Sequence, residues 1–117
     1  MKWEQGRQGE GYEKLKLFES RRFKFDVYLM RFWPCSEIQG HRDPAVEGYE
    51  HHRLNIVLQD HNAVFWTEEN GKRKWWWNRI HRFRPDTTLH GMQPFVSYGK
   101  PVGYWLSIGW LRKKSRG

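Results

Sequence analysis

Alternation of apolar and polar side chains is the dominant pattern from residue 22 onward, and it predicts β-strands rather than helices. Residues 22–33 show it most clearly, and Pro34 follows where that strand would end. Similar segments predict further strands at residues 51–58, 63–67, 73–84, 95–98 and 103–111. The strand at 73–84 is expected to break near Arg82. Turn signals separate them: Asn70-Gly71 tolerates the positive φ of a tight hairpin, and Pro85-Asp86 suits another turn. About seven short strands with such spacing indicate an all-β sandwich or barrel.

The first 21 residues lack this clear alternation and are expected to form an N-terminal arm. The segment is polar and rich in glycine, with weak helical character between Tyr12 and Ser20, so we expect a short and mostly irregular arm. Residues 22–117 are then expected to form a single domain, because a chain of 117 residues has room for one core only.

A strong basic excess narrows the range of expected partners. The formal net charge is +8 and the pI is near 9.9, which favours negatively charged partners such as nucleic acid or acidic small molecules. Eight Trp, seven Phe and five Tyr supply apolar surface for a packed core despite a mean hydropathy of −0.96.

The cysteine content and the length of the apolar segments indicate the cellular compartment in which the protein is expected. Cys35 is the only cysteine in the sequence, so no intrachain disulfide can form, which suits a reducing compartment. No apolar run approaches the roughly 20 residues that a membrane span needs, and the N-terminal residues lack the apolar core of a signal peptide. We therefore expect a cytoplasmic protein without a membrane partner.

Three residues have the order and spacing of a metal-binding triad. His41 and Asp43 are two residues apart, so on a strand their side chains would point to the same face of a sheet. His90, arriving from a distant strand, would complete a set of two imidazoles and one carboxylate, which leaves positions open on iron. The competing interpretation is a solvated surface turn for the first pair and a core histidine for the third.

The order of these landmarks resembles that of the oxygenases that use Fe(II) and 2-oxoglutarate, especially their prolyl and aspartyl/asparaginyl hydroxylase branches. The resemblance covers about residues 22–111 and rests on His41-x-Asp43, on His90, and on the segments 53–58, 82–86 and 104–110. It implies a double-stranded β-helix, that is, a jelly-roll or cupin-like barrel, with Fe(II) and 2-oxoglutarate as cofactors. It also implies hydroxylation of a protein side chain, while the basic charge keeps a nucleic acid or nucleotide substrate open. Compact relatives of this kind are similar to phage and bacterial proteins, and a homodimer is one possible assembly.

The resemblance implies a basic residue that anchors the far carboxylate of 2-oxoglutarate. Lys100 lies ten residues after His90, the spacing common in that family, and Arg53 is the alternative because its face of the strand could point into the barrel. Asn55 on the same face and Ser107 on the last strand could also contact the co-substrate. The sequence leaves open which of them binds it.

A basic and aromatic segment favours a second kind of ligand. Charged side chains for phosphate beside flat rings for bases are what a single-stranded nucleic-acid platform needs. The segment offers these possible contacts: Lys72, Arg73, Lys74, Trp75 and Trp77. Alternate residues of a strand face opposite sides, so the same tryptophans could instead pack in the core and cover the sheet.

We therefore predict a small Fe(II)- and 2-oxoglutarate-dependent oxygenase and keep two alternatives open. One is a non-catalytic basic β-barrel that binds nucleic acid, and the other is a cupin-like small-molecule binder whose metal is not iron. The four remaining histidines are interpreted as structural or surface residues, with one of the first two as a spare ligand: His51, His52, His61 and His81.

Overall fold

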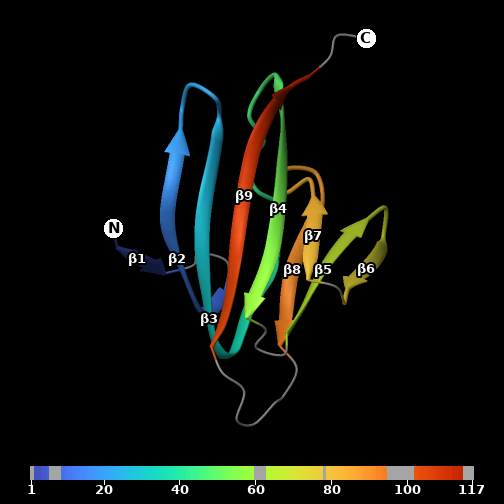
Figure 1. The fold of residues 1–117 in the computed structure, drawn as a ribbon. Coiled ribbons are helices and arrows are strands. Elements are labelled where there is room, and N and C mark those ends of the chain that lie inside the picture. Colours follow the sequence, from blue (N-terminus) through green and yellow to red (C-terminus); the bar gives the residue numbers. More distant parts are fainter. Residues whose placement is uncertain (1, 6–8, 60–62, 78, 95–101, 115–117) are drawn as a thin grey trace.

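The computed structural model describes residues 2–5, 9–59, 63–77, 79–94 and 102–114, and every regular element in them is a β-strand (Figure 1). The strands are β1 (Trp3–Gln5), β2 (Gly9–Ser20), β3 (Phe25–His41), β4 (Tyr49–Gln59), β5 (Ala63–Glu69), β6 (Lys72–Trp76), β7 (Ile80–Phe83), β8 (Leu89–Pro94) and β9 (Gly103–Lys113). The predicted all-β class is confirmed. No helix long and apolar enough to cross a membrane occurs in the described ranges.

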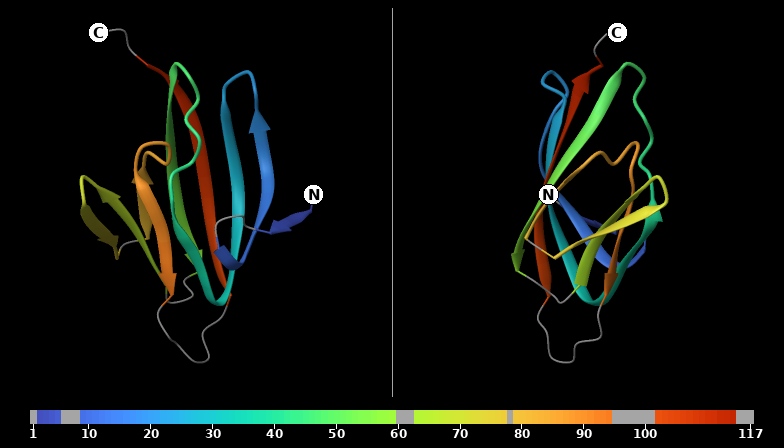
Figure 2. Two further views of the ribbon diagram at one scale, coloured as in Figure 1. Left: turned by 180° about the vertical axis from the view of Figure 1, so that it is seen from behind. Right: turned by 90° about the vertical axis from the view of Figure 1, so that its right-hand side faces the viewer.

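The strands form two antiparallel layers that share β3 (Figure 2). From Phe25 to Phe32, β3 pairs with β9, and this layer continues through β4 to β7. From Ile38 to His41, β3 pairs with β8 instead, and the second layer continues through β5 to β6. β3 therefore connects the two layers along one side. β6 and β7 are the terminal strands of the sheet order, and they lie at the other side.

Residues 9–20 do not form the irregular arm that was expected. They form β2, which pairs with β3 from Gly9 opposite Ile38 to Ser20 opposite Phe25. Tyr12 of β2 is buried and stacks on Phe32 at 5.8 Å between ring centroids. The pairing partner is the next strand in the chain, so β2 and β3 form a hairpin, and this pairing supplies the hydrogen bonds and burial that the local pattern does not reveal.

Three other element bounds differ from the prediction. β3 does not end at Pro34 but runs to His41, and the proline falls between the stretches paired with β9 and with β8. The break in the 73–84 segment separates Trp76 from Ile80 instead of lying near Arg82. A strand at Leu89–Pro94 was not predicted, and the strand predicted at residues 95–98 lies outside the described residues. The predicted hairpin turn is confirmed, with φ of 53° at Asn70 and 75° at Gly71.

Aromatic side chains from both layers form the core. Phe32 and Trp105 lie 4.6 Å apart between centroids, and Phe65 lies 5.9 Å from Trp105. The full buried cluster is Tyr12, Phe32, Ile38, Phe65, Phe83, Met92 and Trp105. Several of these side chains also line a cavity of about 650 Å³ between the layers. The core therefore forms one wall of the space that contains the candidate site.

Candidate metal centre

His41 and His90 face each other across two neighbouring strands. They are direct partners in the antiparallel pairing of β3 with β8, and their ring centroids lie 4.3 Å apart. In each ring Nδ1–H donates to the backbone carbonyl two residues earlier, of Gln39 at 2.8 Å and of Thr88 at 2.9 Å. Because a carbonyl can only accept, each ring carries a proton on Nδ1, so Nε2 is the atom through which either ring would bind a metal.

Asp43 completes the group from the loop after β3. Its N–H donates to the carbonyl of Pro85 at 2.7 Å, which fixes the loop against the turn that precedes β8. Its Oδ1 lies 3.1 Å from His41 Nε2 and 3.9 Å from His90 Nε2, and all three donor atoms lie within 4.8 Å of one another. Two imidazole nitrogens and one carboxylate oxygen in this arrangement fit a divalent transition metal with free coordination positions.

Burial and mutual charge tune the three groups toward ligand function. Burial lowers the pKa of His90 to about 4, against the opposing hydrogen bond to Thr88, so the ring is neutral at pH 7. Burial alone would lower the pKa of His41 and raise that of Asp43. Burial is outweighed only by several contributions together: the hydrogen bond between the two groups, their charge attraction, the hydrogen bond of His41 to Gln39 and the charge of His90 beside Asp43. The pKa of His41 is therefore raised and that of Asp43 is lowered. A metal would therefore meet a neutral imidazole and a carboxylate, and would compete with a proton at His41.

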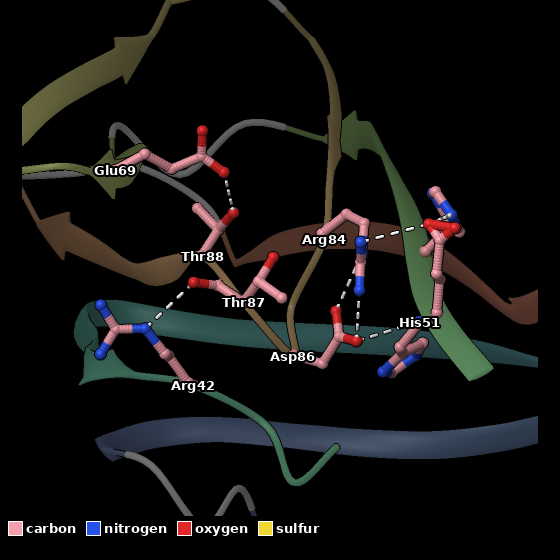
Figure 3. A network of polar contacts seen from close by, with 9 residues as sticks. Arg42, His51, Glu69, Arg84, Asp86, Thr87 and Thr88 are labelled. Carbon is pink, nitrogen blue, oxygen red and sulfur yellow. Dashed lines mark hydrogen bonds and ion pairs between the residues drawn. The ribbon is translucent and has the colours of Figure 1, made fainter. Parts of the chain in front are cut away.

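A turn formed by residues 84–88 positions the ligands from outside the centre (Figure 3). In addition to the Pro85 and Thr88 carbonyls described above, the Thr87 carbonyl accepts from Arg42 Nε at 3.1 Å. Asp86 holds the turn together, because it accepts from Arg84 at 3.1 and 2.7 Å and from the His51 N–H at 3.2 Å. All three ligands thus depend on this turn, directly or through their neighbours.

Trp66 supports the two histidines from behind. It is buried, and it lies opposite Gly91 in the pairing of β5 with β8. A Cβ atom at Gly91 would lie 2.8 Å from the Trp66 ring, and one at Gly40 would lie 2.6 Å from it. Gly40 precedes His41 and Gly91 follows His90, and neither has a side chain that would keep the indole away from the backbone. The Arg73 guanidinium covers the outer face of that ring at 4.0 Å from its centroid.

The cavity extends from the triad to the predicted co-substrate residues. Arg53 reaches into it from β4 and donates to Ser107 at 2.7 Å and to Asp26 at 2.8 Å. Ser107 in turn donates to Asn55 at 2.6 Å. Gly109 lies between Asp26 and Arg53 in register, and a Cβ atom there would overlap the guanidinium. The glycine therefore allows Arg53 to cross β9, and it is the sequence signal for this arrangement.

Some cavity residues were not singled out from the sequence as site residues, and one predicted residue is not described. Lys14 of β2 lines the cavity with its Nζ 5.6 Å from the Tyr28 ring centroid, and its charge lowers the pKa of His41. It was missed because β2 was not expected to be a strand. His51 also lines the cavity, and its pKa is lowered by burial and by the charge of Arg53. Lys100 lies outside the described residues.

The predicted nucleic-acid residues divide between two faces of β6. Lys72 and Lys74 line a groove of about 590 Å³ together with Trp76. Arg73 lies on the opposite face, 5.4 Å from the Trp75 ring centroid, and Trp77 beyond the strand is 74% exposed. Trp76, rather than its neighbours, is therefore the aromatic residue beside the lysines.

The histidines outside the triad have different surroundings. His52 stacks on Trp110 at 5.7 Å, and His81 is buried and stacks on Phe65 at 4.7 Å. These two contacts agree with structural roles. His61 lies outside the described residues.

Comparison with known proteins supports the fold. No protein-family model and no curated protein matches the sequence. A prolyl-4-hydroxylase from Pseudomonas putida has a similar structure, with a TM-score of 0.69 and 10% identity over 97% of this chain and 78% of that one. KdgF from a Halomonas species has a TM-score of 0.63 and 14% identity, over 97% of this chain and 88% of that one. A predicted oxalate decarboxylase from Thermotoga maritima has a TM-score of 0.64 and 17% identity, over 89% of this chain and 84% of that one.

The fold is that of the cupin and jelly-roll proteins. The predicted double-stranded β-helix is thereby confirmed. Identities of 10–17% establish the architecture only. Together with the clustered donor atoms, this architecture fits a cupin-like metal-binding role.

Proposed function

We propose that this protein is an oxygenase that uses Fe(II) and 2-oxoglutarate. The observation that carries the proposal is that His41, Asp43 and His90 face the same cavity as Arg53. A facial set of three ligands leaves open positions for a chelating 2-oxo acid and for oxygen, and the guanidinium suits a second carboxylate. The likeness to a prolyl-4-hydroxylase adds support at the level of fold.

The chain's own residues provide geometry and exclude water. Nε2 of His90 brings a neutral lone pair, Nε2 of His41 brings one once a metal displaces its proton, and Asp43 brings one negative charge. Bound there with 2-oxoglutarate and oxygen, Fe(II) would supply the oxidising chemistry: one oxygen atom enters a C–H bond of the substrate, while the other enters succinate as carbon dioxide leaves. Phe65 and Trp105 are both buried and form an apolar part of the cavity wall, which shields that side of the cavity from water.

An anaerobic titration with Fe(II) and 2-oxoglutarate tests the proposal. The chelate gives a weak visible charge-transfer band, which we expect for the wild type and not for Asp43→Ala. His52→Ala is the matched control for a histidine variant, because His52 packs on Trp110 away from the triad. It should keep the band, whereas His90→Ala should lose it.

Two results would contradict the oxygenase. Metal retention without any 2-oxoglutarate band would favour a cupin-like binder of another small molecule, and metal analysis would then identify the ion. No metal retention at all would remove the basis for either metal-dependent activity.

The groove beside β6 favours nucleic-acid binding as a second candidate function. Lys72, Lys74 and Arg82 line it with Trp76, so positive charge and a flat ring occur together. A fluorescently labelled oligonucleotide should bind with an affinity that falls steeply with salt and is unaffected by chelators. Lys72→Glu with Lys74→Glu should abolish this binding, whereas His90→Ala should not change it.

A further inference from the structure

Arg53 is already paired with a carboxylate of this chain. Asp26 on β3 accepts from Arg53 Nη2 at 2.8 Å, and the two side chains are 28% and 15% exposed. Asp26 and Arg53 are both opposite Gly109 in the sheet, so the pair spans three adjacent strands within the cavity. The contact is therefore part of the barrel wall and not a flexible surface pair.

Two N–H groups of the guanidinium have acceptors within the sheet. Nη1 donates to Ser107 at 2.7 Å, and Nη2 donates to Asp26. Ser107 is held by Asn55 at 2.6 Å, so the hydroxyl cannot turn away without leaving the Asn55 oxygen without its donor. Of the groups around Arg53, Asp26 is the one whose place a ligand carboxylate can take with the same charge and geometry.

We propose that Asp26 determines the ligand specificity of the cavity, because a ligand carboxylate that takes the Nη2 position of Arg53 must exchange with the Asp26 carboxylate. This inference rests on the proposed function, in which 2-oxoglutarate is the ligand. The exchange lowers the affinity for any carboxylate that binds at Arg53 alone. A dicarboxylate whose other end is held at the metal overcomes this loss of affinity, because tethering raises the effective concentration of the far carboxylate at Arg53.

The test compares three acids by calorimetry on the wild type and on Asp26→Asn. Glutarate has two carboxylates and no metal-chelating keto group, 2-oxoglutarate has both features, and 2-oxobutanoate chelates but has no far carboxylate. We expect Asp26→Asn to bind glutarate and 2-oxoglutarate about fivefold more tightly or better, a factor that corresponds to about 1 kcal/mol. Binding of 2-oxobutanoate should change by less than about twofold.

Two further variants separate exchange from a general charge effect. Glu19→Gln removes a carboxylate that also lines the cavity but pairs with Lys16, so it should give no comparable gain. Asp26→Asn combined with Arg53→Met should lose the gain, because the guanidinium is then absent. Asp26→Ser repeats the test with a smaller side chain, and thermal unfolding checks that each variant is folded.

Each outcome of these measurements supports or refutes the exchange of carboxylates at Arg53. Equal gains in Asp26→Asn and Glu19→Gln, an equal gain for 2-oxobutanoate, or no glutarate binding by Asp26→Asn would overturn the exchange. If the Fe(II) band forms in the wild type but Asp26→Asn gains nothing, the oxygenase proposal stands and the exchange is refuted. If no band forms while Asp26→Asn tightens glutarate binding through Arg53, the exchange stands and the oxygenase is refuted.

Discussion

Asp86 offers the sharpest test of how the fold positions the metal ligands. Its side chain is only 2% exposed, and it accepts two hydrogen bonds from Arg84 and one from the His51 N–H. Hydrogen bonds to charged groups contribute about 1.5–3 kcal/mol each. Arg84 is 28% exposed and keeps its contact with Glu50 at 3.2 Å, so part of that contribution survives in a variant. We expect Asp86→Ala to lower the free energy of unfolding by about 2–4 kcal/mol.

Thermal unfolding followed by circular dichroism measures that loss, and a fall in Tm of about 10 °C is expected for a chain of this size. The residue binds no metal, but it holds the turn whose carbonyls orient His90 and Asp43. Loss of such supporting contacts commonly lowers metal affinity by about 10–100-fold. Calorimetric titration with Zn²⁺ at a temperature where the variant is fully folded separates this effect from unfolding.

Glu68→Ala is the matched control for Asp86→Ala. Its carboxylate accepts from Arg73 at 3.4 Å in a more exposed pair, where about 0–1 kcal/mol is expected and metal affinity should not change. If Asp86→Ala lost stability but bound Zn²⁺ like the wild type, the turn would not position the ligands. An unchanged Tm would refute the estimate of its contribution to folding.

Three other outcomes are expected. Burial would raise the pKa of Asp86, but the hydrogen bonds from Arg84 and from backbone N–H groups, together with the charge of Arg84, outweigh it and lower that pKa. The stabilising effect of Asp86 is therefore complete above about pH 4 and is lost on further acidification. The unfolding free energies of the wild type and Asp86→Asn, measured in urea, should therefore converge as the pH falls below about 4; a constant difference would contradict the linkage. Gly91→Ala should cost about 1–3 kcal/mol by chemical denaturation, because its Cβ would lie 2.7 Å from the Ile38 carbonyl oxygen and 2.8 Å from the Trp66 ring. Wild-type stability of this variant would show that both the backbone and the indole can move away. Zn²⁺ at about 100 times its Kd should stabilise the wild type by about 2.7 kcal/mol in a thermal shift assay and leave the Tm of His90→Ala unchanged, and an equal shift in both would place the metal elsewhere.

Alternation in the sequence predicted several of the strands, although not β2 or β8, and it did not predict which face of a strand points inward. On β3 the face toward the cavity carries Asp26 and Tyr28, whereas Val27 and Leu29 lie on the opposite face. A binary pattern would assign the apolar face to the interior. The polar face lies inside because the cavity contains Arg53, whose charge needs a partner there.

The three predicted ligands could be selected from their order and spacing, and the structure brings them together, although Asp43 lies in the loop after β3 and not on the strand that the spacing argument assumed. Their role as ligands stays a prediction. The supporting contacts could not be selected in this way. The turn acts largely through the backbone carbonyls of Pro85, Thr87 and Thr88, and every residue type has a carbonyl. The residue types in the turn therefore give little information about these supporting contacts.

The position of β6 at the end of the strand order has a consequence for self-association. Its only partner among the described strands is β5, so one side presents backbone donors and acceptors that a second chain could pair with. Lys72, Arg73 and Lys74 are all exposed on this strand, and stacking two copies would bring like charges to within one strand spacing. The same basic run that suggests a ligand surface thus also keeps the open edge from becoming a template for fibrils.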